Sequence, residues 1–143
     1  MIHLVDIDSS NWRTPLKVSK AQEEYVASST TILARAYAYR NFGSHALYIY
    51  ENETPVGMVL YYDDDSLESY VFSELFIDEK FQGYGYGKAA AKLVLDAMKK
   101  DGKYSKVILC YIEGNNAAKR LYEGFGFVET ERDEDEIIME LNL

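Results

Sequence analysis

The chain has 143 residues, 48% of them hydrophobic and 27% charged, which predicts one globular domain over residues 1–143 with a hydrophobic core. Its formal net charge of −9 disfavours nucleic-acid binding, because an acidic surface repels phosphate. One cysteine and two histidines offer neither an intrachain disulfide nor an evident metal site, and no apolar run nears the ~18 residues of a membrane span, so we expect a cytoplasmic protein.

The first half of the chain predicts one strand, two helices and an antiparallel hairpin. Apolar residues at helical spacing indicate the helices, and apolar segments on either side of the turn Glu51-Asn52-Glu53 indicate the hairpin. The expected elements are a strand over 2–7, a helix over about 16–25, a helix capped by Ser29, Thr30 or Thr31 and ended by 41–43, and strands over 46–50 and 56–62.

The second half alternates strands with helices. The clearest helix follows the glycines at 83–87, with apolar residues on one face, basic residues in its last turn and Gly102 after its end. After Lys106 the chain is continuously apolar to Ile112, so we expect a strand over 106–112 that is buried on both faces, with Cys110 as a buried small side chain. The other expected elements are a strand over 70–77, a helix from Asn115 or Asn116 to Tyr122, and strands over 127–128 and 137–141.

Three glycines at alternate positions, Gly83, Gly85 and Gly87, lie between a predicted strand and the strong predicted helix. Glycine accepts positive φ and lets a phosphate approach the backbone, and a helix N-terminus adds free N–H groups and partial positive charge. The loop therefore predicts a diphosphate ligand, and a tight turn without a ligand is the alternative.

Nucleotide-binding patterns fit this loop poorly. A P-loop needs a differently spaced first glycine and a hydroxyl after its lysine, and the residue after Lys88 is alanine. The run Gly85-Tyr86-Gly87-Lys88-Ala89-Ala90 matches a loose dinucleotide pattern, but the short chain leaves no room for a six-stranded Rossmann sheet. The ribose-binding acid would also fall in the apolar strand near Val107. A nicotinamide-dependent oxidoreductase is therefore the weaker alternative.

Two blocks carry a family resemblance. Gln82-x-x-Gly85-x-Gly87 and Asn115-x-x-Ala118-x-x-Leu121-Tyr122-x-x-x-Gly126-Phe127 resemble, in order and spacing, the signatures of the GNAT N-acetyltransferase superfamily. Within it the chain most resembles bacterial spermine/spermidine (diamine) acetyltransferases, on Leu16-Lys17-Val18-Ser19 with Gln22 and Tyr25 and on the run from Phe76 to Gly83. The resemblance implies an α/β (α+β) GNAT fold of order β-α-α-β-β-β-α-β-α-β-β, whose mixed sheet has six to seven strands. Its splayed central strands would hold acetyl-CoA.

The resemblance also implies a set of contacts with acetyl-CoA. Backbone N–H groups from Gly83 through Lys88 would bind the pyrophosphate. The strand Leu75-Phe76-Ile77 would pair with the pantetheine arm, and the Phe76 amide would polarise the thioester carbonyl. The implied cofactor-binding residues are Leu75, Phe76, Ile77, Gln82, Gly83, Tyr84, Gly85, Tyr86, Gly87, Lys88 and Asn115, with no metal.

Two catalytic residues are implied as well. Tyr122 would be the general acid for the departing thiolate, since a phenol with a reference pKa of about 10 stays protonated; a core tyrosine is the alternative. Glu74 would be the base that deprotonates the acceptor ammonium, or else a carboxylate exposed on the sheet. Simple alternation puts Glu74 on one face with Phe72 and Phe76, although a bulge, usual in this strand of the family, would change that. Ser73 stands where related polyamine enzymes tend to carry a carboxylate.

The implied reaction is acetyl transfer from acetyl-CoA to a primary amine of a small cationic acceptor, such as spermidine or spermine, by direct attack in a ternary complex. The acidic runs 63–68 and 129–136 could attract that acceptor, although solvated turns also explain them. The alternatives are another acceptor (a protein N-terminus, a lysine, an amino acid or an aminoglycoside) and a non-catalytic CoA-binding module. Family members are commonly dimers, so a homodimer is compatible with the resemblance.

Overall fold

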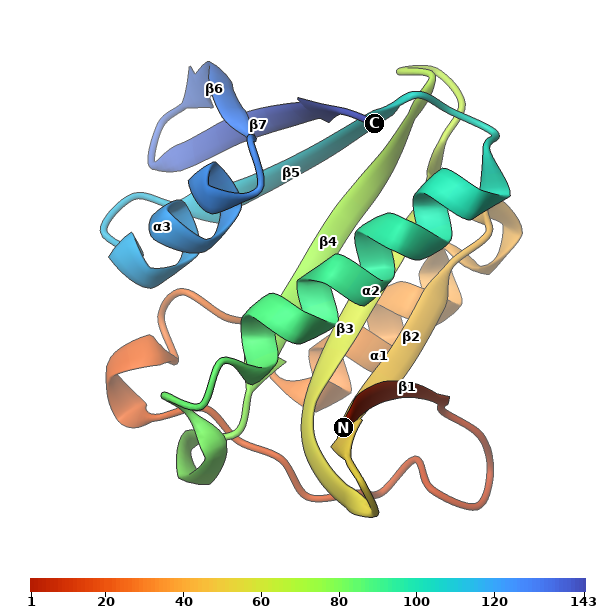
Figure 1. Ribbon diagram of the computed structural model, residues 1–143, viewed down its shortest axis with the longest axis vertical. Coiled ribbons are helices and arrows are strands. Elements are labelled where there is room, and N and C mark those ends of the chain that lie inside the picture. The colour runs from red at the N-terminus through yellow and green to blue at the C-terminus, as the bar shows by residue number, and fades with distance from the viewer.

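The computed structural model describes residues 1–143 as a seven-stranded mixed sheet with helices on both faces (Figure 1). The strand order is β1-β2-β3-β4-β5-β7-β6, and only β4 and β5 are parallel. The strands are β1 (Ile2–Asp6), β2 (His45–Glu51), β3 (Thr54–Asp64), β4 (Ser69–Ile77), β5 (Lys106–Ile112), β6 (Val128–Asp133) and β7 (Glu136–Asn142). The helices are α1 (Ser29–Ala38), α2 (Tyr86–Asp101) and α3 (Asn116–Gly124), with 3-10 turns at Lys20–Gln22, Arg40–Phe42 and Glu79–Phe81. This architecture confirms the fold class expected from the sequence.

Two hydrophobic clusters hold the helices against the sheet. α2 lies on one face, where its apolar stripe, including Ala90, Val94 and Met98, is buried in the larger cluster together with Tyr122 of α3. α1 lies on the other face, where Ile32 is buried in the smaller cluster. Figure 1 shows α2 in front of the sheet and α1 behind it. Burial of these apolar side chains is the main contribution that stabilises the fold. None of the helices has the length and apolarity that crossing a membrane demands.

The segment 16–25 is not the helix that its apolar spacing predicts. Only Lys20–Gln22 form a 3-10 turn. The Lys17 N–H donates to Asp78 Oδ2 (3.0 Å), and the Lys17 carbonyl accepts from the Glu79 N–H (3.0 Å). These long-range bonds draw the backbone to the end of β4 instead of into a helical ladder, so tertiary contacts override the local pattern. The next helix begins at the predicted place, but its cap is Ser28, whose Oγ accepts from the Thr31 N–H (3.2 Å).

The expectation that β5 is buried on both faces is wrong. Val107, Leu109 and Tyr111 are buried under the larger cluster, whereas Cys110 on the opposite face is exposed. The reason is that α1 packs over β2 and β3 and leaves the corresponding face of β5 uncovered. Cys110 is therefore not the buried small side chain that its apolar neighbours predict.

The two parallel strands at the centre of the sheet separate along their length. β4 and β5 pair only through Tyr70 with Val107 and Val71 with Ile108, although each strand continues for several residues beyond. Figure 1 shows the two strands meeting at one end and diverging toward α3. The expected splay of the central strands is therefore confirmed, and it leaves strand edges without strand partners at the open end.

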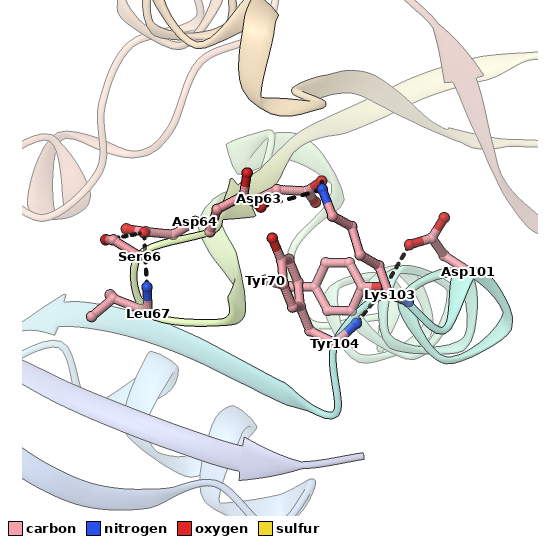
Figure 2. A network of polar contacts seen from close by, with 9 residues as sticks. Asp63, Asp64, Ser66, Leu67, Tyr70, Asp101, Lys103 and Tyr104 are labelled. Carbon is pink, nitrogen blue, oxygen red and sulfur yellow. Dashed lines mark hydrogen bonds and ion pairs between the residues drawn. The ribbon is translucent and has the colours of Figure 1, made fainter.

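A polar network holds together the end of the sheet at which β4 and β5 are paired (Figure 2). The Tyr70 hydroxyl donates to Asp101 Oδ2 (2.5 Å) and accepts from the Lys103 N–H (2.9 Å). Lys103 Nζ in turn pairs with Asp63 (3.1 Å) and Asp65 (3.3 Å). These bonds join the β3–β4 turn, the start of β4 and the end of α2. Two carboxylates of the first acidic run, Asp63 and Asp65, are thus paired with Lys103 at this end, away from the end at which β4 and β5 separate.

A bulge interrupts β4 at Ser73. Leu60 of β3 is opposite Glu74, and the next β3 residue, Tyr61, is opposite Phe72, which leaves Ser73 without a register partner. Each side of the bulge keeps its own alternation, so Phe72 and Leu75 pack with the α2 cluster. Phe76 instead packs with the α1 cluster. The simple alternation that grouped Phe72, Glu74 and Phe76 on one face is therefore wrong for Phe72.

Gly57 of β3 permits the close pairing of β3 with the end of β4. A Cβ at this position would lie 2.2 Å from the Phe76 carbonyl oxygen. We expect Gly57→Ala to lower the free energy of unfolding by about 2 kcal/mol, because the strands must shift apart. Urea denaturation measures this, with Gly124→Ala in α3 as the matched control. An added Cβ at Gly124 meets nothing within 4 Å, so that variant is expected to be neutral or slightly stabilising. Equal destabilisation of the two variants would contradict the strand-spacing argument.

Candidate functional site

The loop between β4 and α2 is anchored at its start by a buried aspartate. Asp78 is only 3% exposed, and its Oδ1 accepts from the Lys80 N–H (3.0 Å) while its Oδ2 accepts from Lys17. Farther along, Gln82 Nε2 donates to the Ile77 carbonyl (3.0 Å) and to Gln22 Oε1 (2.6 Å). Hydrogen bonds to the segment 17–22 and to the loop's own backbone therefore fix the loop before the glycines begin.

Two glycines in the loop adopt a conformation that favours glycine. Gly83 (φ +85°) and Gly85 (φ +81°) are left-handed, and an added Cβ at either would meet nothing within 4 Å. The first helical bond of α2 runs from the Ala89 N–H to the Gly85 carbonyl (3.2 Å). The N–H groups of residues 86–88 precede this bond and have no partner within the helix. The loop thus presents free N–H groups and a helix N-terminus to open space, which suits an anion.

A cavity of about 300 Å³, here called the glycine-loop cavity, lies between this loop, the end of β4 and α3. Most of the predicted cofactor residues line it: Leu75, Phe76, Ile77, Gln82, Gly83, Gly85, Tyr86, Gly87 and Asn115. Tyr84 and Lys88 do not; Tyr84 is exposed and stacks on Tyr86 at 5.5 Å between ring centroids, and Lys88 is exposed on α2. The cavity is also lined by residues to which the sequence reading assigned no ligand contact: Val18, Gln22, Val26, Phe81, Ala117, Ala118 and Leu121.

Tyr122 of α3 lines the same cavity. Its ring packs edge-on against Phe72 (5.9 Å) and Phe127 (5.6 Å). Burial raises the pKa of its phenol above the ordinary value, and the nearby Glu74 charge raises it further. Tyr122 is therefore a protonated donor at neutral pH. Asn115 caps α3, and its Oδ1 accepts from the Ala118 N–H (3.2 Å), which leaves its amide nitrogen for other partners.

A second cavity, of about 490 Å³, lies over the uncovered face of β5 and is here called the Glu74 cavity. It shares Val26 with the glycine-loop cavity, and the two cavities take consecutive residues of β4, Glu74 and Leu75. Its polar and aromatic lining residues are Glu24, Tyr25, Arg35, Tyr39, Tyr62, Phe72, Ser73, Glu74, Cys110, Tyr111 and Glu136. Three carboxylates, four tyrosines and a single cation make this lining acidic and aromatic.

Glu74 is a largely buried carboxylate that lines the second cavity. Its side chain is 16% exposed, and its Oε1 accepts from Arg35 Nη1 (2.5 Å). Burial raises the pKa of the Glu74 carboxyl, and the Arg35 guanidinium opposes that rise through its hydrogen bond and its charge. The alternative reading of Glu74 as a freely exposed sheet carboxylate is therefore wrong.

Arg35 is the residue of the candidate site that sequence reasoning missed most clearly. A signal was present, because Arg35 stands three residues after Ile32, the one fully buried residue of α1. Residues three apart share a helix face, so this spacing places the arginine on the side of α1 that faces the sheet, where a carboxylate is a favourable partner. The hydrophobic pattern of the helix does not say which carboxylate that is.

Comparison with known proteins identifies the family of the chain. Residues 5–127 match the acetyltransferase (GNAT) family. The spermine/spermidine N(1)-acetyltransferase of Bacillus subtilis (strain 168) is 34% identical over 118 residues, covering 78% of this chain and 76% of that protein.

Two solved structures share the fold at low identity. The PaiA N-acetyltransferase of Thermoplasma acidophilum, solved with coenzyme A, has a TM-score of 0.77 at 16% identity and covers 100% and 99% of the two chains. The spermidine N-acetyltransferase of Vibrio cholerae, solved with CoA and spermine, has a TM-score of 0.78 at 18% identity and covers 99% and 95%. With its two sequence blocks, its splayed β4 and β5 and these matches, the chain belongs to the GNAT family of acetyltransferases.

Proposed function

We propose that the protein transfers the acetyl group of acetyl-CoA to a primary amine of a small polyamine, such as spermidine or spermine. The observation that carries the proposal is the meeting of two cavities at consecutive residues of β4, one beside an anion-binding loop and the other acidic and aromatic. The named function of the Bacillus subtilis relative supports the same acceptor class.

The glycine-loop cavity suits acetyl-CoA. Open space above Gly83 and Gly85, beside the free N–H groups at the start of α2, fits a pyrophosphate. The edge of β4 beyond Val71 has no strand partner on the β5 side, so an extended pantetheine arm could pair with it as an added strand. Leu75, Phe76 and Ile77 would hold that arm, and Asn115 would contact it from α3. Acetyl-CoA supplies the activated acetyl group and a thiolate leaving group.

The Glu74 cavity suits a cationic amine. Carboxylates attract an ammonium group, and tyrosine faces add cation–π attraction. Glu136, from the second acidic run, lines this cavity, so that run contributes one charge to it. The reacting ammonium would give a proton to Glu74, and the resulting amine would attack with its lone pair. Tyr122, on the glycine-loop side, would donate a proton to the departing sulfur.

Cys110 offers a direct test of where the acceptor binds. It is the only cysteine of the chain and is exposed in the Glu74 cavity. Partial desolvation by the cavity walls raises the pKa of the Cys110 thiol, and the charges of Glu136 and Glu74 add to this, so alkylation is best followed at alkaline pH. Spermidine at ten times its dissociation constant is expected to slow labelling by iodoacetamide about tenfold, because only the unoccupied cavity reacts.

The control is sodium chloride at matched ionic strength, which should leave the labelling rate nearly unchanged. A panel of amines with a thiol-release assay then identifies the acceptor. Turnover only with peptides, amino acids or aminoglycosides would replace the polyamine by one of these as the acceptor. No turnover with any amine would favour a non-catalytic CoA-binding module. Unchanged labelling in the presence of an amine that is turned over would place the acceptor outside the Glu74 cavity.

A further inference from the structure

Arg35 is hydrogen-bonded to Glu74, the carboxylate that would act as the base in the proposed reaction. Its Nη1 donates to Glu74 Oε1 (2.5 Å) and to Ser73 Oγ (3.3 Å) across the bulge of β4. The side chain is 35% exposed, so its guanidinium reaches the Glu74 cavity from α1. The contact uses one carboxylate oxygen of Glu74, and Oε2 has no protein hydrogen-bond partner.

Arg35 is also the only positive charge among the groups that face Glu74. The other titratable groups that line the cavity are carboxyls, phenols and one thiol, none of which can carry a positive charge. They are Glu24 and Tyr25 before α1, Tyr39 and Tyr62 at the end of α1 and on β3, Cys110 and Tyr111 on β5, and Glu136 on β7, with Tyr122 of α3 close by. Without Arg35 nothing in the cavity would offset the burial of the Glu74 carboxylate.

We propose that Arg35 is a positioning residue that keeps Glu74 ionised and aims its free oxygen, Oε2, at the acceptor ammonium. This rests on the proposed function. In the step concerned, the Glu74 carboxylate takes one proton from the ammonium and becomes a neutral carboxyl, and the nitrogen keeps the electron pair with which it attacks. Arg35 remains bound through Oε1, so the carboxyl stays oriented and returns its proton to water afterwards.

The pH dependence of kcat/KM tests this role. In Arg35→Gln the acid limb of the profile is expected to move up by about one pH unit, because a carboxylate that loses a neighbouring cation is harder to ionise. On the acid limb the variant is therefore expected to be about tenfold slower than the parent, and at alkaline pH the two rates converge. Arg35→Lys keeps the charge and is expected to restore most of the original profile.

Matched controls separate this effect from a loss of structure. Arg40 lies outside both cavities and stacks on Tyr37 (4.1 Å from its guanidinium carbon to the ring centroid), so Arg40→Gln is expected to keep the parent profile. Thermal unfolding confirms that each variant is folded at the assay temperature. A uniform loss of kcat/KM at every pH in Arg35→Gln, with no rescue by lysine, would overturn the inference and assign Arg35 a structural role.

A readout without turnover keeps this inference separate from the proposed function. Carboxyl ¹³C titration by NMR, with Glu74→Gln to assign the signal, measures the Glu74 pKa directly in the parent and in Arg35→Gln. An upward shift in the variant supports the role of Arg35, and an unmoved value overturns it, whether or not an acceptor is found. No turnover with any amine overturns the proposed function, and an acid limb that survives in Glu74→Gln overturns Glu74 as the proton acceptor.

Discussion

Tyr122→Phe is expected to lower kcat by about 10²–10³-fold while leaving the affinity for CoA nearly unchanged. The hydroxyl is the only group removed, and the ring keeps its edge-on contacts with Phe72 and Phe127. Because burial raises the pKa of the phenol, Tyr122 remains a proton donor throughout the neutral and mildly alkaline range. Without that proton the sulfur must leave as an unassisted thiolate.

Steady-state kinetics together with calorimetric CoA binding would measure both effects. The matched control is Tyr104→Phe, since the Tyr104 hydroxyl is buried without a hydrogen-bond partner and lies outside both cavities. Its removal is expected to leave kcat unchanged and to be neutral or stabilising for the fold. If the Tyr122 and Tyr104 variants were equally active, Tyr122 would be a packing residue.

Gly85→Ala is expected to weaken CoA binding by about 100-fold, which corresponds to ~2.7 kcal/mol or the loss of one to two charge-assisted hydrogen bonds. The new methyl group would enter the open space above the loop, where the pyrophosphate is proposed to lie. It would also strain the left-handed backbone at φ +81°. Isothermal titration with CoA measures the loss.

Gly102→Ala separates strain from steric exclusion. Gly102 caps the other end of α2 in the same left-handed conformation (φ +71°), so the backbone cost is similar. It lies outside the glycine-loop cavity, and its variant is therefore expected to lose stability without losing CoA affinity. Equal losses of affinity in the two variants would show that a weakened helix, not a blocked loop, accounts for the effect.

The glycine loop could be predicted from the sequence because its physics is local. Left-handed glycines before a helix N-terminus need no distant partner, and Gly83 and Gly85 have the positive φ expected of them. The helix expected over 16–25 failed for the opposite reason. Lys17 instead bonds through its backbone to Asp78 and Glu79, which follow the end of β4, and no pattern within ten residues reveals that.

The second cavity could not be predicted from the sequence. An apolar run such as β5 shows that a strand is present, but whether a face is covered depends on where α1 packs, and this decided the exposure of Cys110. The bulge at Ser73 also depends on contacts between distant segments. Family resemblance made a bulge an expectation, but only the register of β3 with β4 shows which side chains it redirects. The pairing of Arg35 with Glu74 depends on both features.

The alternation of side chains in β4 beyond the bulge has a further consequence for how ligands reach the site. Since Glu74 and Leu75 are adjacent in β4 yet belong to different cavities, the partition between them is one backbone thick. A ligand in each cavity could therefore come within bonding distance of the other, and each could enter or leave through its own cavity. Substitutions around the Glu74 cavity could also alter the choice of acceptor and leave the glycine-loop cavity, with its donor, unchanged.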